Sequence, residues 1–190
     1  MTLPNVISML RIPMMFLIGV FFYNSFTGAK MLAFILYVLA GITDWLDGYV
    51  ARKYKQVSDF GKLIDALNDK IFTISMFVIL AGKGLIPIWG IFCILFIICR
   101  EFFITGLRIL VAKTGQVLAA EKMGKVKTVL QIVVVGSFFL IEMLKTDGNA
   151  WCSRSFICFL VVVNYVNFVI TTVLTTYSGY NYLKKYRQYL

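Results

Sequence analysis

Long apolar runs alternate with short polar segments along the whole chain. Six apolar runs can be drawn, at residues 5–23, 31–51, 61–80, 87–111, 128–144 and 156–177. A helix needs roughly 20 mostly apolar residues to cross the hydrocarbon core of a bilayer, and each run approaches that length. The pattern therefore predicts an all-α integral membrane protein with six transmembrane helices, folded as a single domain over residues 1–190.

The composition agrees with a bilayer as the solvent. Hydrophobic residues make up 60% of the 190 residues and charged residues 15%, and the mean hydropathy is +0.84. Soluble domains average about 45–50% apolar and about 25% charged residues. Six spanning helices use most of a chain of this length, so no large domain outside the membrane is expected.

Basic residues are distributed unevenly between the two sets of loops. The net charge is +10, which in a soluble protein would favour nucleic-acid binding but here suits a surface of anionic lipid head groups. Eleven basic residues lie after the second and fourth runs and in the C-terminal tail, and four lie in the opposite loops. Because cytoplasmic loops carry the excess of Lys and Arg, both termini are expected in the cytoplasm. Membrane lipids are the expected partners, and nucleic acid is not.

Acidic residues gather in one short part of the chain. Of nine Asp and Glu residues, five lie between positions 44 and 69. Asp44 and Asp47 are three residues apart and Asp65 and Asp69 are four apart, so each pair shares one face of a helix. A helical hairpin that turns near residues 53–58 would bring both pairs together at one depth of the membrane.

Four carboxylates placed together repel one another, and acids inside a membrane are already unfavourable. Divalent cations would offset this charge. Histidine is absent and none of the four cysteines forms a Cys-x-x-Cys pair, so the ligands are oxygens, which suit hard ions such as Mg²⁺, Mn²⁺ or Ca²⁺. Two such ions could orient a diphosphate and stabilise charge on a phosphoryl group under attack. The alternative is that the acids form salt bridges at helix ends.

Small and basic residues lie between the two acidic pairs. Gly48, Ala51 and Gly61 leave room beside the carboxylates, so that backbone can approach a nucleotide closely and helices can pack tightly. Arg52 can contact a phosphate or the acids themselves. On the first run, Asn5 can contact the nucleotide or the acids, although it can equally cap a helix.

This spacing resembles the signature of the CDP-alcohol phosphatidyltransferase family. The pattern D-x-x-D-G-x-x-A-R-x8-G-x3-D-x3-D is filled at all its fixed positions, by Asp44, Asp47, Gly48, Ala51, Arg52, Gly61, Asp65 and Asp69. The resemblance implies six transmembrane helices, a homodimer and a site open to the cytoplasm. It also implies two divalent metals, Mg²⁺ or Mn²⁺, held by the four aspartates, with Asp69 as general base. It places CDP near the small residues and Arg52.

A wider resemblance links the chain to the bacterial phosphatidylglycerophosphate synthases, one branch of this family. It rests on four further blocks, which are Leu3-Pro4-Asn5 with Leu10-Arg11, Arg100-Glu101 to Arg108, Gly124-Lys125 to Gln131, and Ser178-Gly179 with Tyr182. This branch commonly reads D-P-x-A-D-K where the chain has Asp65-Ala66-Leu67-Asn68-Asp69-Lys70. No carboxylate is lost, so the departure concerns local helix geometry and pocket shape. The branch implies a multi-pass protein of the bacterial inner membrane.

Basic residues in and beside the apolar runs indicate that the alcohol which accepts the phosphatidyl group carries a phosphate. Arg100 and Arg108 interrupt the fourth run and share roughly one helical face, and Lys125 and Lys127 precede the fifth run. A basic pocket facing the aspartates would suit the phosphate of glycerol 3-phosphate. The alternative is that these side chains extend to the membrane surface.

The expected reaction converts CDP-diacylglycerol and sn-glycerol 3-phosphate into phosphatidylglycerol phosphate and CMP. One alternative keeps the fold and changes the acceptor, as in a cardiolipin synthase that uses phosphatidylglycerol. Other branches of the family use inositol phosphate, serine or choline. A third hypothesis is a transporter or channel in which the aspartates line a path for cations.

Overall fold

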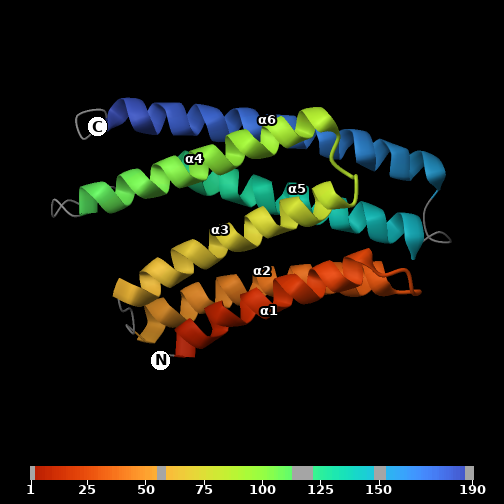
Figure 1. The fold of residues 1–190 in the computed structure, drawn as a ribbon, viewed down its shortest axis with the longest axis horizontal. Coiled ribbons are helices and arrows are strands. Elements are labelled where there is room, and N and C mark those ends of the chain that lie inside the picture. The colour runs from red at the N-terminus through yellow and green to blue at the C-terminus, as the bar shows by residue number, and fades with distance from the viewer. Residues whose placement is uncertain (1–2, 55–58, 113–121, 148–152, 187–190) are drawn as a thin grey trace. The chain divides into compact units, whose positions relative to one another are not determined.

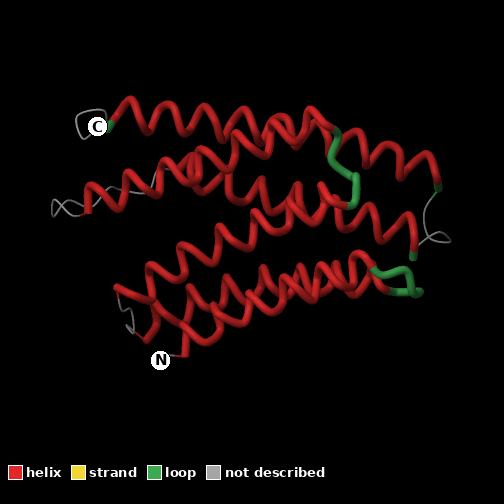
Figure 2. The backbone as a smooth tube through the Cα atoms, in the orientation of Figure 1, coloured by secondary structure: helices red, strands yellow, loops and turns green. Residues whose placement is uncertain are grey.

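The computed structural model describes residues 3–54, 59–112, 122–147 and 153–186, and for residues 3–8, 44–54, 59–66, 112, 122, 123 and 125 it describes the backbone alone. Within these ranges the chain forms six helices (Figure 2). They are α1 (Leu3–Tyr23), α2 (Ala29–Tyr54), α3 (Asp59–Gly82), α4 (Ile88–Ala112), α5 (Lys122–Thr146) and α6 (Arg154–Lys185), labelled in Figure 1.

The helices confirm the all-α prediction and extend beyond several of the apolar runs. α6 continues to Lys185, past the expected end at residue 177, and α5 begins at Lys122 instead of residue 128. Hydropathy identifies the part of a helix that suits hydrocarbon, whereas the backbone hydrogen bonds continue where the side chains become polar. The apolar pattern therefore predicted the number and order of the helices better than their ends.

Three helical stretches in the described part of the chain are long and apolar enough to cross a membrane. They are Ile88–Val111, Val126–Thr146 and Arg154–Lys185. Met9–Tyr23 and Ala29–Thr43 are shorter apolar helical stretches. These lengths support a membrane protein, and six complete spans remain a prediction.

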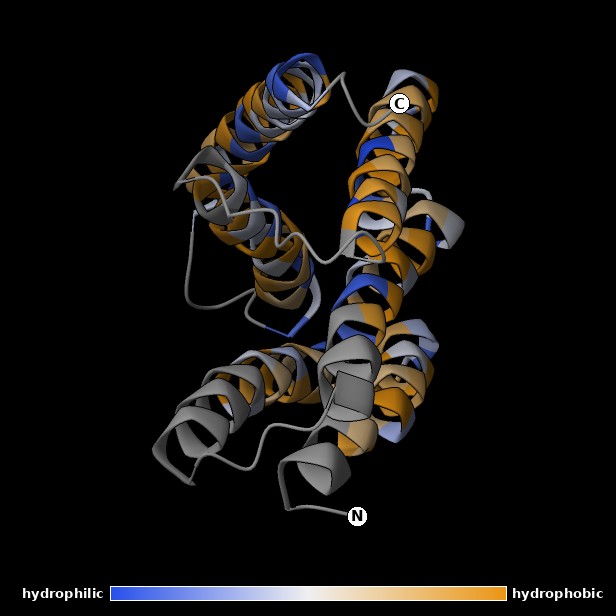
Figure 3. Ribbon diagram, turned by 90° about the vertical axis from the view of Figure 1, so that its left-hand side faces the viewer, coloured by the Kyte–Doolittle hydropathy of each residue, from blue (hydrophilic) through white to orange (hydrophobic). Residues whose placement is uncertain are grey.

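The side chains of α6 are arranged as lipid requires. Its buried positions are largely polar and include Asn164, Thr171, Thr172, Thr175 and Ser178. Its exposed positions are largely apolar and include Phe159, Val162, Val166, Val169 and Val173. Figure 3 shows apolar residues over long stretches of the helices. Soluble proteins bury their apolar residues and expose their polar ones, so this reversed pattern fits a helix whose outer face contacts lipid.

The chain forms two compact units that share α5 and α6. Unit 1 comprises Met1–Leu85 and Val135–Val161, and unit 2 comprises Ile86–Val134 and Val162–Leu190. Each unit has its own packed interior, and the two predicted groups of functional residues fall in different units. The aspartates belong to unit 1, and the basic residues of the fourth and fifth runs belong to unit 2.

Aromatic rings join the helices of unit 1. The ring of Phe139 on α5 lies 4.6 Å from that of Phe22 on α1 and 5.3 Å from that of Tyr37 on α2. Tyr37 also stacks on Phe72 of α3, with 6.1 Å between ring centroids. Gly136 makes room for this arrangement, because a Cβ atom there would lie 3.0 Å from the Tyr37 ring. One continuous set of contacts therefore ties α1, α2 and α3 to α5.

Unit 2 has a separate interior built around Tyr182 of α6. Its ring packs with Ile104, Leu107 and Val111, which lie on one face of α4. Only 1% of Tyr182 is exposed, so its hydroxyl needs a partner inside the protein.

Hydrogen bonds stabilise two turns of unit 1 that lie away from the aspartates, one after α3 and one between α1 and α2. α3 ends at Gly82, and Gly84 follows it with a φ of 75°, which suits glycine. The Leu85 N–H donates a hydrogen bond of 3.1 Å to the Leu80 carbonyl, which satisfies a free carbonyl of the last turn. At the start of α2, the Asp147 carboxylate accepts hydrogen bonds from Gly28 N–H (3.2 Å) and Met31 N–H (2.9 Å). Asp147 follows α5, so it attaches that helix to the α1–α2 turn.

Candidate active site

The four predicted metal ligands belong to the two helices of one hairpin. Asp44 and Asp47 are in the C-terminal part of α2, and Asp65 and Asp69 are in the N-terminal half of α3. Asp69 is half-buried, and the side chains of the other three lie outside the described residues. The side chains that are described contain no group of three Asp, Glu, Cys or His residues that could hold a metal. The proposed metal cluster is therefore argued from helix register.

The stacked rings of Tyr37 and Phe72 set this register. They lie 6.1 Å apart with an angle of 17° between their planes. Asp44 follows Tyr37 by one heptad, and Asp65 precedes Phe72 by one heptad. A heptad advances a straight helix by about 10 Å and rotates it by only about 20°. Because α2 and α3 are antiparallel (Figure 1), this register predicts that Asp44 and Asp65 lie at one height of the hairpin.

The other two acids lie about one turn away along the same helices. Asp47 is one turn beyond Asp44 on α2, and Asp69 is one turn closer to Phe72 on α3. Four carboxylate positions therefore fall within a few turns of one hairpin. This set of donors, which lacks His and Cys, fits Mg²⁺ or Mn²⁺.

The departure from the branch pattern leaves α3 intact around Asp69. The helix runs from Asp59 to Gly82 without interruption, although Ala66 and Asn68 replace the usual proline and alanine. Asn68 is buried. The Thr73 hydroxyl donates a hydrogen bond of 3.0 Å to the backbone carbonyl of Asp69. The substituted sequence thus keeps Asp69 on a regular helix.

The predicted nucleotide contacts are distributed over three helices of unit 1. They are Asn5 on α1, Gly48, Ala51 and Arg52 on α2, and Gly61 on α3. Their side-chain positions lie outside the described residues. Binding of CDP by these residues stays a prediction.

In unit 2, two of the predicted phosphate-binding cations share one carboxylate. Lys127 of α5 forms an ion pair with the Glu101 carboxylate of α4, and Arg100 lies 3.5 Å from the same oxygen. Lys127 is only 4% exposed, so its ammonium group does not extend to the membrane surface. The alternative that these basic side chains extend to the membrane surface therefore does not hold for Lys127, which is buried and paired.

The two arginines of α4 both contact hydroxyl groups of α6. Arg100 donates a hydrogen bond of 3.0 Å to the Ser178 hydroxyl. Arg108 donates one of 3.3 Å to the Tyr182 hydroxyl, and its guanidinium carbon lies 5.6 Å from the centre of the Tyr182 ring. The side chain of Lys125 lies outside the described residues. We refer to Arg100, Glu101, Arg108 and Lys127 as the basic cluster.

The charge of the basic cluster suits a phosphate monoester. Arg100 and Lys127 are paired with Glu101, and Arg108 lies about two turns further along α4. The four side chains together carry a net charge of +2. A phosphate monoester carries about −1.5 to −2 at pH 7, so it would nearly neutralise the cluster. A phosphate diester carries a single negative charge and would offset only half of this charge.

The hydroxyl groups of α6 had no predicted role. Ser178 and Tyr182 belong to the family resemblance alone, and no function was expected for Thr175, which accepts a hydrogen bond of 3.4 Å from Gln131. A signal was available, since polar residues recur at helical spacing on α6 within an otherwise apolar run. In a membrane helix such a polar stripe indicates a face turned toward other helices.

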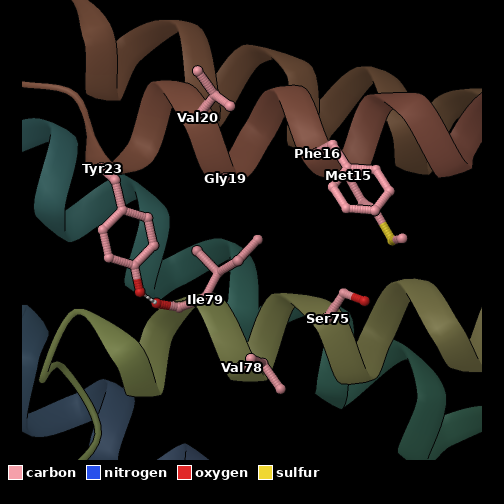
Figure 4. A pocket seen from close by; sticks show the side chains of 8 residues that line it. All are labelled: Met15, Phe16, Gly19, Val20, Tyr23, Ser75, Val78 and Ile79. Carbon is pink, nitrogen blue, oxygen red and sulfur yellow. Dashed lines mark hydrogen bonds between the residues drawn. The ribbon is translucent and has the colours of Figure 1, made fainter.

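An apolar groove of about 490 Å³ runs between α1 and α3 in unit 1. It is lined by Met15, Phe16, Gly19, Val20, Tyr23, Ser75, Val78 and Ile79. Figure 4 shows Tyr23 and Ile79 at one end and Met15 and Phe16 at the other, with Gly19 between them. The Tyr23 hydroxyl closes its end by donating a hydrogen bond of 3.0 Å to the Ile79 carbonyl. The lining has no charged group, so it offers no ligand for a phosphate or a metal.

Comparison with known proteins identifies the family of the chain. The profile of the CDP-alcohol phosphatidyltransferase family matches residues 1–177. The chain belongs to this family. Its members among curated proteins include enzymes named CDP-diacylglycerol–glycerol-3-phosphate 3-phosphatidyltransferase. One from Rickettsia felis is 34% identical over 187 residues, which are 98% of this chain and 96% of that protein.

Two further relatives carry the same enzyme name. The protein from Rickettsia bellii is 35% identical over 187 residues, covering 98% of this chain and 96% of its own length. The protein from Bacillus subtilis is 43% identical over 117 residues, which are 62% of this chain and 59% of the relative. The predictions that the chain is a CDP-alcohol phosphatidyltransferase and a transferase of phospholipid synthesis are thus confirmed.

Proposed function

We propose that this CDP-alcohol phosphatidyltransferase transfers the phosphatidyl group of CDP-diacylglycerol to sn-glycerol 3-phosphate. The products are phosphatidylglycerol phosphate and CMP. The relatives with matches over nearly their whole length are named for this reaction. The observation that carries the choice of acceptor is the basic cluster, whose net charge of +2 matches a phosphate monoester dianion.

The residues of the hairpin have distinct roles in this reaction. Asp69 accepts the proton of the 1-hydroxyl of the acceptor while that oxygen attacks the phosphorus nearest the lipid. The bond from this phosphorus to the CMP oxygen breaks, and CMP leaves with its electron pair. Asn5, Gly48, Ala51, Arg52 and Gly61 hold the cytidine nucleotide.

The four aspartates of the hairpin would hold two divalent ions, Mg²⁺ or Mn²⁺. When bound, these ions polarise the diphosphate and neutralise charge that develops on it. The heptad relation of Asp44 to Tyr37 and of Asp65 to Phe72 supports this assignment. Two acids at one height would otherwise repel strongly in a medium of low dielectric constant.

The acceptor phosphate binds Arg100, Arg108, Lys125 and Lys127 in our proposal. Arginine suits this role because its planar fork of donors matches phosphate oxygens. Phosphatidylglycerol, the acceptor of a cardiolipin synthase, offers only a monoanionic diester. The charge of the cluster therefore favours glycerol 3-phosphate over this alternative.

We also propose that the chain is a homodimer that crosses the bacterial inner membrane six times, with both termini and the active site on the cytoplasmic side. The distribution of eleven basic residues against four supports the orientation. Labelling of single cysteines placed in the loops of a cysteine-free variant would test it.

One assay tests the reaction. Purified protein in lipid nanodiscs is given CDP-diacylglycerol and labelled glycerol 3-phosphate with Mg²⁺ or Mn²⁺, and labelled lipid and CMP are measured. Equal amounts of both products are expected. Labelled product from phosphatidylglycerol, but none from glycerol 3-phosphate, would reject the proposed acceptor. Cation flux into proteoliposomes without any transfer would favour the transporter hypothesis.

A further inference from the structure

The Ser178-Gly179…Tyr182 segment of α6 contacts both arginines of α4. Arg100 is largely buried, whereas Arg108 is exposed. All three residues lie in the polar stripe of α6, and Ser178 and Tyr182 are each only 1% exposed. Each of them contacts one arginine of α4, and Gly179 lies beside Arg100. These contacts give every residue of the segment a separate physical role.

Gly179 provides the space in which Arg100 crosses α6. A Cβ atom at position 179 would lie 2.6 Å from the Cγ atom of Arg100, closer than two carbon atoms can approach. Cγ belongs to the stem of the side chain, so it cannot move aside without carrying the guanidinium group with it. Ser178, the preceding residue, then accepts a hydrogen bond from that guanidinium group at 3.0 Å.

Tyr182 holds Arg108 in two ways. Its hydroxyl accepts a hydrogen bond from Arg108 at 3.3 Å, and its ring is within cation–π distance of the guanidinium carbon at 5.6 Å. The ring itself is fixed by the apolar face of α4, formed by Ile104, Leu107 and Val111. Arg108 therefore contacts a tyrosine that has little freedom to move.

From these contacts we infer that Ser178, Gly179 and Tyr182 form an arginine cradle that orients Arg100 and Arg108 for the acceptor phosphate. They are positioning residues, because they act through the two arginines. An arginine has five N–H donors, and a single hydroxyl uses one of them. The other donors remain for Glu101, for neighbouring groups and for a phosphate. This inference rests on the proposed function, which supplies the phosphate-bearing acceptor.

Kinetics of three variants test the cradle. Ser178→Ala and Tyr182→Phe each remove one hydroxyl, and we expect each to raise KM for glycerol 3-phosphate by about three- to tenfold, because hydrogen bonds to charged groups are the stronger ones. The kcat and the KM for CDP-diacylglycerol should stay near the wild-type values. Ser178→Thr, which retains a hydroxyl, should restore most of the affinity lost in Ser178→Ala.

Matched controls come from the same helix. Tyr180 is 63% exposed, so Tyr180→Phe removes a phenol hydroxyl from the opposite side of α6. The Thr176 hydroxyl bonds to the Thr172 carbonyl of its own helix at 2.9 Å, so Thr176→Ala removes a hydroxyl that contacts no arginine. Neither control should change KM for glycerol 3-phosphate. A cradle variant that behaves like its control, or that lowers only kcat, would overturn the inference.

A measurement without turnover separates the cradle from the proposed reaction. In a double-mutant cycle of Arg108→Gln and Tyr182→Phe, the thermal unfolding of the purified protein is compared for all four forms. Non-additive changes are expected, because either substitution removes the same contact. Additive changes would reject the contact even if the wild-type enzyme transfers to glycerol 3-phosphate. Non-additive changes without any transfer would retain the contact and reject the proposed acceptor.

Discussion

Lys127 of α5 forms an ion pair with Glu101 of α4, and the same carboxylate oxygen lies 3.5 Å from Arg100. Glu101 thus balances part of the charge of two cations that are themselves largely buried. Removing a carboxylate from such a group leaves cations without compensation in a medium that solvates them poorly. Glu101 therefore stabilises the basic cluster by compensating the charge of Lys127 and Arg100.

Glu101→Gln should lower the stability of the protein by about 1–3 kcal/mol, because a charged acceptor of Lys127 is replaced by a neutral one. The net charge of the cluster would rise from +2 to +3, so added glycerol 3-phosphate should recover more stability in the variant than in the wild type. Thermal unfolding with and without the phosphate measures both effects. Glu142→Gln is the control, because Glu142 pairs with the exposed Lys145 at 3.9 Å. Equal unfolding temperatures for the wild type and Glu101→Gln would contradict this prediction.

Asp44→Asn and Asp65→Asn should weaken metal binding to a similar degree, because the register of the Tyr37 and Phe72 rings predicts that both positions lie at one height of the hairpin. After treatment with EDTA, the wild type should regain activity with Mg²⁺ or Mn²⁺, and each variant should need about tenfold more metal or remain inactive. Titration of CMP release against metal concentration provides the measurement. Asp147→Asn, an acid of the same unit at the opposite end, serves as the control and should keep the wild-type titration. An unchanged metal requirement in both hairpin variants would refute the metal site.

The helices and the positions of the aspartates along them could be predicted from the sequence, because the alternation of apolar runs and polar segments is strong. Six apolar runs gave the six helices in order, and the spacing of the aspartates placed them on one hairpin before any packing was known. The family was predicted from the eight fixed positions of its signature, four of which are these aspartates. The profile match over residues 1–177 confirms it. These features depend on local sequence, which the chain displays directly.

Contacts between distant helices could not be predicted in this way. Nothing local in the sequence states that Arg108 meets Tyr182 or that Phe139 lies between Phe22 and Tyr37. Such pairs depend on the rotation of each helix about its axis, which hydropathy leaves open because lipid and protein interior are both apolar. The roles of Glu101 and the α6 hydroxyls were missed for this reason.

Asp147→Ala should destabilise unit 1 by removing the acceptor of two N–H groups at the start of α2. Loss of such a cap typically costs about 1 kcal/mol, so the unfolding temperature should fall by about 2–4 °C for a chain of this size. Circular dichroism during heating measures the change. Asp147→Asn keeps one side-chain oxygen and should lose less. If both substitutions leave the unfolding temperature unchanged, the cap makes no contribution to stability.

The affinity for glycerol 3-phosphate should fall in mildly acidic solution. The second pKa of a phosphate monoester is about 6, so below that pH the acceptor becomes a monoanion and attraction to a cluster of charge +2 weakens. We expect KM for glycerol 3-phosphate to rise as the pH falls through about 6, with a smaller change in KM for CDP-diacylglycerol. A phosphonate analogue of the acceptor, whose second pKa is higher, should show the same rise at a higher pH. If the two acceptors lose affinity at the same pH, the protonation lies in the enzyme instead, and the match between the charge of the cluster and the dianion no longer determines acceptor binding.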